Sequence, residues 1–323
     1  MNACGESGSP GVGTRTCPAL DLRTFPVPFQ PVAIAAGPDG NLWFAATSLV
    51  GKITPSGAVT TFPLTSSAFA LASGPDGNLW FTQPSAGAIS RMTPAGEITQ
   101  FSGMGMVGGL AAGADGNLWF TRGWPTSPSS SAIGRMTTSG AATLFDTIQG
   151  YYVRAIAAGP GADLWYADPS HPFLWQIDMS GVQKEFPTPN MLATPMAIVT
   201  GPDSNIWFVD MGWLLAEGVT DPTFHVHSHI GRSAVNGTMV EFPLPTDHVA
   251  KDIALGADGD LWFTLDAADT YPGVGLQYDG LGRITPSGAV MEVPLAGGAK
   301  GIAGGPDGNL WFTQVSAVSS MCP

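Results

Sequence analysis

The chain has few charged residues, and most of them are acidic. Charged residues make up 11% of its 323 residues, with 12 Lys plus Arg against 25 Asp plus Glu, for a net charge of −13. A surface with this balance repels phosphate backbones, so we expect no nucleic-acid partner. No apolar run approaches the roughly 20 residues that a membrane-spanning helix needs, so we expect no transmembrane segment. The sequence also contains no G-x-S-x-G nucleophile elbow and no phosphate-binding P-loop.

Cysteine is equally scarce. Cys4, Cys17 and Cys322 lie outside the repeated part of the chain and have none of the spacings of a zinc site. The Gly-, Ser- and Pro-rich segment 1–18 predicts a flexible leader, which leaves a single domain over 19–323.

The leader contains one pattern that indicates where the protein is located. Asn2-Ala3-Cys4-Gly5 resembles the end of a bacterial lipoprotein signal peptide, where a small residue precedes the lipid-bearing Cys. It predicts a lipid anchor at Cys4 and an extracytoplasmic protein, secreted, periplasmic or lipid-anchored. An ordinary exposed cysteine in a tail is the alternative.

What the chain has in abundance is one repeated motif, best represented by Gly-Pro-Asp-Gly-Asn-Leu-Trp-Phe. Its Trp recurs at positions 43, 80, 119, 165, 207, 262 and 311. The intervals between successive Trp residues are close to the length of one four-stranded propeller blade. Each unit has a small-residue strand, a Pro-Asp-Gly turn, a buried aromatic strand, a third strand and an outer strand. The sequence therefore predicts an all-β fold, a seven-bladed β-propeller of four-stranded blades.

The two ends of the chain complement each other. The last unit stops after a third strand at Val318-Ser319-Ser320-Met321, and Leu22-Arg23-Thr24-Phe25-Pro26 is an outer strand with no unit of its own. We expect the N-terminal strand to complete the last blade and close the ring, which removes the exposed sheet edges. Because no turn joins these two strands, a Cys17–Cys322 disulfide is predicted to tie them. Two unpaired tail cysteines are the alternative.

Tandem G-P-D-G-x-L-W-F-T, followed by I-G-R-I-T-P-x-G and E-F-P-L-P, resembles the virginiamycin B lyase (streptogramin lyase) family over about residues 20–323. The resemblance implies magnesium and a His/Glu constellation that opens an ester-linked cyclic antibiotic by elimination. It places the catalytic groups in P-H-G-I-A before the turn and W-F-T-E after it.

This chain departs from the family pattern in both places. The first slot, where the family has His, holds Val32, Phe69, Gly108, Arg154, Met196, Lys251 and Lys300. The second slot, where the family has Glu, holds Ala46, Gln83, Arg122, Asp168, Asp210, Leu265 and Gln314. His248 lies five residues before Ile253, out of register with the family position. The lyase constellation is therefore not visible in this sequence.

Basic residues gather in these two slots. Five of the 12 recur in third strands and are scaffold positions: Lys52, Arg91, Arg135, Arg232 and Arg283. Four others occupy slots: Arg122, Arg154, Lys251 and Lys300. In an acidic protein this concentration predicts an anion site on one rim. The alternative is a structural network with Asp168, Asp210 and Asp252.

Long connections after the second strands of blades 3 to 6 point to the same rim, because function gathers on loops of a rigid scaffold. They carry Trp124, Trp213 and Tyr271. The predicted ligand-binding set therefore comprises Arg122, Arg154, Asp168, Asp210, Lys251, Lys300, Trp124, Trp213 and Tyr271, in a pocket lopsided toward blades 3 to 6.

Histidines form a separate candidate site. His225, His227 and His229 alternate, so in a strand all three point to one side. Alternating histidines bind zinc or copper, and His248 follows on the next connection between blades. Exposed histidines at a polar strand end are the alternative.

Three functions remain open at this level. The first is an extracytoplasmic propeller, expected to be monomeric, that binds a small acidic or aromatic ligand, or a protein, on the rim. The second is a metal-dependent lyase or hydrolase with a rearranged site, using magnesium, zinc or copper. The third is a structural or surface-interaction propeller.

Overall fold

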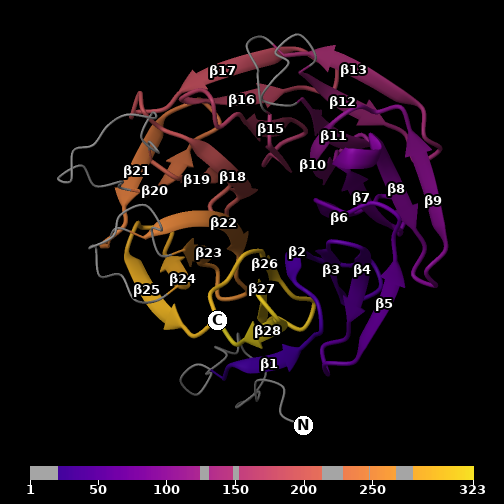
Figure 1. Cartoon of the computed structure of the whole chain (residues 1–323). Coiled ribbons are helices and arrows are strands. Elements are labelled where there is room, and N and C mark those ends of the chain that lie inside the picture. The colour runs from indigo at the N-terminus through magenta and orange to yellow at the C-terminus, as the bar shows by residue number, and fades with distance from the viewer. Residues whose placement is uncertain (1–20, 124–130, 148–152, 213–227, 247, 267–278) are drawn as a thin grey trace, which may run out of the picture.

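The computed structural model describes residues 21–123, 131–147, 153–212, 228–246, 248–266 and 279–323. These residues form seven four-stranded antiparallel sheets arranged as a ring around a central channel (Figure 1). The predicted seven-bladed β-propeller is confirmed. Among the described residues, the one helix is a short 3-10 turn, η1 (Pro84–Ala86).

The strands are short, and each blade runs from an inner strand at the channel to an outer strand at the circumference. Blades 1 and 2 comprise β2 (Pro31–Ala36), β3 (Leu42–Ala46), β4 (Leu49–Ile53), β5 (Val59–Pro63), and β6 (Leu71–Ser73), β7 (Leu79–Gln83), β8 (Ala88–Met92), β9 (Ile98–Ser102). Blades 3 and 4 comprise β10 (Val107–Ala112), β11 (Leu118–Arg122), β12 (Ala132–Met136), β13 (Ala142–Asp146), and β14 (Ala155–Ala158), β15 (Leu164–Ala167), β16 (Phe173–Ile177), β17 (Gln183–Pro187). Blades 5 and 6 comprise β18 (Pro195–Thr200), β19 (Ile206–Asp210), β20 (His229–Ser233), β21 (Met239–Pro243), and β22 (Val249–Leu255), β23 (Leu261–Asp266), β24 (Asp279–Ile284), β25 (Val290–Leu295). Blade 7 comprises β26 (Ile302–Gly304), β27 (Leu310–Gln314), β28 (Ala317–Met321) and, from the other end of the chain, β1 (Arg23–Pro26).

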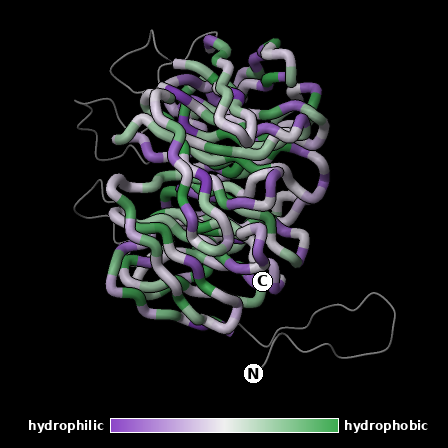
Figure 2. The backbone as a smooth tube through the Cα atoms, turned by 90° about the vertical axis from the view of Figure 1, so that its right-hand side faces the viewer, coloured by the Kyte–Doolittle hydropathy of each residue, from purple (hydrophilic) through white to green (hydrophobic). Residues whose placement is uncertain are grey.

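The core lies between neighbouring blades and is built around the motif Trp. Trp80 is fully buried and stacks on Phe101 of its own outer strand, with ring centroids 5.5 Å apart. The turn of blade 3 then packs Gly140 against the same Phe101, where a Cβ would lie 2.3 Å from the ring. Gly140 has φ +97°, so both the turn and the close approach require glycine. Seen edge-on, the hydrophobic stretches run through the middle of the disc (Figure 2).

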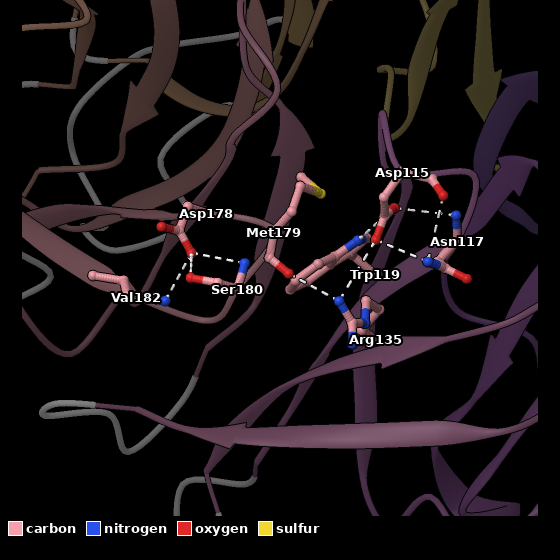
Figure 3. A network of polar contacts seen from close by, with 8 residues as sticks. All are labelled: Asp115, Asn117, Trp119, Arg135, Asp178, Met179, Ser180 and Val182. Atoms are coloured by element: carbon pink, nitrogen blue, oxygen red, sulfur yellow. Dashed lines mark hydrogen bonds and ion pairs between the residues drawn. The ribbon is translucent and has the colours of Figure 1, made fainter.

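In six of the seven blades the motif Trp donates a hydrogen bond to an Asp of its turn, and Trp165 in blade 4 is the exception. In blade 3, Asp115 accepts hydrogen bonds from Trp119 Nε1 (3.1 Å) and from Asn117 (Figure 3). The guanidinium of Arg135 lies 5.7 Å from the Trp119 ring centroid and donates to the carbonyl of Met179 in blade 4 at 2.8 Å. All five third-strand cations lie over a motif Trp, which confirms them as scaffold residues: Lys52, Arg91, Arg135, Arg232 and Arg283.

The ring closes as the two chain ends predict. β1 pairs antiparallel with β28, with Phe25 opposite Val318, and Val27 N–H donates to the carbonyl of Ser316 at 2.9 Å. Phe25 stacks on Trp311 as the other outer-strand Phe residues stack on their own Trp. The N-terminal strand therefore supplies both the hydrogen bonds and the aromatic ring that blade 7 lacks.

Two predictions concern the ends of the chain: the Cys17–Cys322 disulfide and the lipid anchor at Cys4. Cys322 follows β28 and is 6% exposed. Cys17, Cys4 and the leader lie outside the described residues, so the disulfide and the lipid anchor stay predictions. No helix within the described ranges is long and apolar enough to cross a membrane.

Candidate functional site at the mouth of the central channel

A cavity of about 520 Å³ lies where the inner strands begin. Every blade contributes to its wall, with Val32, Phe69, Gly109, Arg154, Met196, Lys251 and Lys300 taken one from each. Six of the seven first-slot residues are therefore brought together around the channel axis, and blade 3 contributes Gly109, the neighbour of its slot residue Gly108. The sequence predicts a pocket displaced toward blades 3 to 6. The cavity formed by the described residues is instead central, because the inner strands of all seven blades converge at the mouth.

Irregular pairing aims the first-slot residues into the channel. In blades 1 and 5 the register shifts around Val32 and Met196, so neither has a partner on the second strand. In blade 6 the shift leaves Lys251 and Asp252 unpaired between Ala250 and Ile253. A β-bulge of this kind redirects a side chain and is common beside binding sites.

In blades 2, 3 and 6 the buried Thr of the W-F-T motif donates a hydrogen bond to the backbone of the slot in the following blade. Thr82 Oγ1 donates to the carbonyl of Gly108 at 2.8 Å, and Thr264 Oγ1 donates to the carbonyl of Lys300 at 3.1 Å. Both threonines are fully buried. At these positions the backbone of the slot is held by a hydrogen bond from the preceding blade.

The wall carries three cations and two carboxylates: Arg154, Lys251, Lys300, Asp252 and Asp266. Lys251 Nζ lies 3.7 Å from Asp266 Oδ2, and both side chains are more than a third exposed, so this pair is weak. The Arg154 guanidinium stands 5.7 Å from the Phe69 ring centroid. Within the described part of the chain, neither Arg154 nor Lys300 forms an ion pair.

Asp252 is a wall residue that the sequence singled out only as a pairing partner. Its carboxylate accepts from the backbone N–H groups of Ile253 (3.0 Å) and Ile302 (3.1 Å), which links blades 6 and 7. Burial raises the pKa of Asp252 to about 6, although those two hydrogen bonds and the positive charge of Arg154 act in the opposite direction. A carboxyl group with a shifted pKa in a charged cavity is a feature of functional sites.

None of the described second-slot residues lines this cavity. Asp266, which follows the slot residue Leu265 at the end of β23, does line it. Asp168 and Asp210 are fully buried within the turns that follow their strands. Asp168 accepts from Ser170 N–H (2.8 Å) and pairs with His171 Nδ1 at 3.1 Å. Asp210 accepts from the N–H groups of Thr194 (2.6 Å) and Gly212 (2.9 Å). Within the described residues, these two carboxylates bond to backbone N–H groups and histidines of their own blades rather than to the slot cations.

Arg122 is also separated from the other slot cations. It ends β11 and lies beside Gly105, where a Cβ would come within 2.9 Å of its Nε. It is not part of the wall of the channel cavity. The physical reason is that the second strand lies one strand farther from the axis than the first. Of the four predicted rim cations, the structure brings together Arg154, Lys251 and Lys300.

The two described histidines of the predicted metal set interact with different carboxylates. His229 Nδ1 lies 3.8 Å from Asp210 Oδ2. His248 is fully buried, and its Nδ1 lies 2.9 Å from Glu292 Oε2. His225 and His227 lie outside the described residues, as do Trp124, Trp213 and Tyr271.

Magnesium is the metal ion that the family resemblance implies. The described residues contain no group of three or more His, Cys, Asp or Glu side chains placed to hold a metal ion. The first slots, where the family has His, supply no imidazole. The described residues therefore do not fit the family's metal site.

These features define the protein as a closed seven-bladed β-propeller with a charged cavity at its channel mouth. The model of the virginiamycin B lyase family matches residues 12–122 and 124–319, and the chain belongs to that family.

Solved structures agree with this fold. A streptogramin B lyase structure is 24% identical, with a TM-score of 0.79 over 94% of this chain and 97% of the other. A catalytically inactive virginiamycin B lyase from Staphylococcus aureus with quinupristin is also 24% identical, with a TM-score of 0.78 over 94% and 99%. Hydrazine synthase from Kuenenia stuttgartiensis is 15% identical, with a TM-score of 0.69 over 91% and 95%. At these identities the likeness establishes the fold alone. None of the curated proteins compared matches the chain.

Proposed function

We propose that this protein is an extracytoplasmic binding propeller that holds a small carboxylate at the mouth of its central channel. The observation that carries the proposal is the convergence of Arg154, Lys251 and Lys300 on one cavity. Three positive charges face two negative ones there, so the wall has a net charge of 3 − 2 = +1 in a protein whose total is −13. The extracytoplasmic location is supported by the lipoprotein-like sequence around Cys4.

The channel mouth differs in charge from the rest of the protein surface. An acidic protein repels anions in general, so a local cationic wall attracts them to one place. Arg154 offers several N–H donors in a rigid fork that matches a carboxylate, and Lys300 adds a mobile ammonium group. Both contribute most to binding where the wall excludes water.

The first test removes these two charges. The double variant Arg154→Met and Lys300→Met is expected to weaken binding of a small carboxylate such as propionate about 30-fold, because two charge-assisted contacts are lost. Titration calorimetry on the full chain measures this.

The matched control is Lys184→Met. Lys184 lies over Phe186 on the outer strand, so this variant removes a charge without touching the channel. Equal losses in the control and the double variant mean that general electrostatics, and not the cavity, binds the anion.

The second test uses pH. Because the pKa of Asp252 is raised to about 6, this carboxyl group gains a proton as pH falls through that value, and the wall becomes more positive. Binding of methanesulfonate, whose own charge is constant in this range, is expected to strengthen about 3- to 10-fold between pH 7.5 and 5. In Asp252→Asn the affinity is expected to be flat over the same range. A pH dependence that survives in Asp252→Asn assigns the effect to another group.

Membership in a lyase family favours one second candidate, a metal-dependent lyase or hydrolase with a rearranged site. It requires a metal site that includes His225 and His227, with zinc or copper as the fitting ions. Metal analysis of the purified full chain separates this candidate from a binding or surface-interaction propeller.

A further inference from the structure

A second cavity of about 250 Å³ lies beside the channel mouth, between blades 2, 3 and 4. Its wall is mainly apolar and includes Ala68, Met106, Val107 and Val153. Among the described residues that line it there is no carboxylate, and the charged residue is Arg154. This second cavity is called the side cavity below.

The side cavity and the channel mouth share two wall residues, Phe69 and Arg154. The guanidinium of Arg154 stands over the Phe69 ring, so these side chains form a common partition. A ligand whose anionic group contacts Arg154 at the channel mouth therefore has an apolar compartment directly beside it.

Gly108, which lines the side cavity, is a first-slot residue without a side chain. Six of the seven blades place a side chain there, whereas blade 3 has Gly108. A Cβ on Gly108 would lie 2.6 Å from Thr121 Oγ1 and 3.5 Å from the carbonyl oxygen of Arg154. Thr121 of the same blade therefore leaves no room for a Cβ at this position, whereas 3.5 Å to the carbonyl of Arg154 in blade 4 is an ordinary contact distance.

We propose that the side cavity receives an aromatic or branched aliphatic group of the ligand whose carboxylate binds at the channel mouth. The ligand class is then an aryl- or alkyl-substituted small carboxylic acid. This inference rests on the proposed carboxylate site and adds the determinant of specificity.

The size of the side cavity supports this class of ligand. An apolar cavity of about 150 Å³ in another protein accommodates benzene, so about 250 Å³ accommodates a phenyl ring or a fused bicyclic ring. An apolar wall with a cation at one end also discriminates against a second charge on the ligand, because a buried charge without a partner is costly.

The test compares propionate with 3-phenylpropionate, which differ by one ring. The wild-type protein is expected to bind 3-phenylpropionate about 10- to 30-fold more tightly, through burial of the ring. In Ser85→Trp this gain is expected to vanish while propionate affinity stays within about twofold. Ser85 is exposed at the rim of the side cavity, in η1, so an indole there fills the cavity without disturbing the core.

Ser139→Trp is the matched control, because Ser139 is an equally exposed serine in the turn between β12 and β13 at the other face. It is expected to leave both affinities unchanged. Thermal unfolding of both variants verifies that they fold.

A crystal soaked with 3-(4-bromophenyl)propionate gives an independent readout that needs no variant. The anomalous signal of bromine is expected in the side cavity, beside Phe69 and Val153. Bromine located elsewhere overturns the inference.

The outcomes separate the two proposals. Equal affinity for the two acids in the wild-type protein overturns the side-cavity inference and leaves the carboxylate site standing. A ring-dependent gain that Ser85→Trp does not reduce also overturns it. If neither acid binds, both proposals fail.

Discussion

Asp115→Ala is expected to lower the free energy of unfolding by about 2–4 kcal/mol, because a partly buried acceptor of several bonds is lost at once. Trp119 Nε1 would lose its 3.1 Å acceptor inside the core, and a buried donor without a partner is costly. Arg135, 3.9 Å from the same carboxylate, would lose its ion pair. Chemical denaturation monitored by circular dichroism measures the change, with the denaturant dependence expected to be unaltered.

The same carboxylate has a pH dependence with a definite sign. Burial alone would raise the pKa of Asp115, but hydrogen bonds from Asn117 and Trp119 and the charge of Arg135 hold it below its ordinary 3.8. Its contribution is therefore present above that pH and is lost as pH falls through the lowered pKa. The difference between wild type and variant should shrink in acid.

Asp178→Ala is the matched control for this variant, and Figure 3 shows both carboxylates. Asp178 accepts from Ser180 and from Val182 N–H in hydrogen bonds that are exposed to solvent, and no Trp is among the described hydrogen-bond donors to it. A clearly smaller loss is expected, because water replaces those bonds. Equal losses would mean that turn chemistry, and not the Trp contact, explains the repeated Asp.

Glu241→Gln is expected to stabilise the protein at pH 8 by about 1–2 kcal/mol, a value reduced for partial solvent screening. Burial, and then the negative charge of Asp210, raises the pKa of Glu241 to about 7, while a backbone N–H of Asn190 acts in the opposite direction. Because the ordinary value is 4.5, the native state keeps a proton that the unfolded chain loses in that window. Stability therefore falls as pH rises from 4.5 to 7, and a neutral Gln removes this penalty.

The control is Glu292→Gln, at the equivalent place in the outer strand of blade 6, where Glu292 faces Gly282 as Glu241 faces Gly231. Glu292 accepts from Thr246 Oγ1 at 2.7 Å and lies 2.9 Å from His248 Nδ1. This variant is expected to lose about 1–3 kcal/mol at pH 8, because it breaks charge-assisted bonds to buried groups. Denaturation at pH 5 and pH 8 measures both, and the explanation fails if both variants shift stability in the same direction at pH 8.

The sequence by itself determined the architecture, because the signals for a blade are local. The Pro-Asp-Gly turns and the short aromatic strands act within one repeat, and seven copies determine the number of blades. Ring closure followed because blade 7 lacks an outer strand and Leu22–Pro26 supplies one. An Asp lies four residues before Trp in six of the seven repeats, although its role as the indole acceptor became clear only from the hydrogen bond itself.

Only the tertiary structure decided which of the slot residues share a site. Arg122 and Arg154 occupy equally regular positions in the sequence, yet only Arg154 lines the channel, because first strands converge on the axis and second strands do not. The bulge that aims Lys251 into the channel, the bond from Asp252 to the next blade and the cavity beside Gly108 arise from contacts between blades. Such contacts join residues tens of positions apart, and a repeat pattern holds no information about how differing side chains at equivalent positions pack against each other.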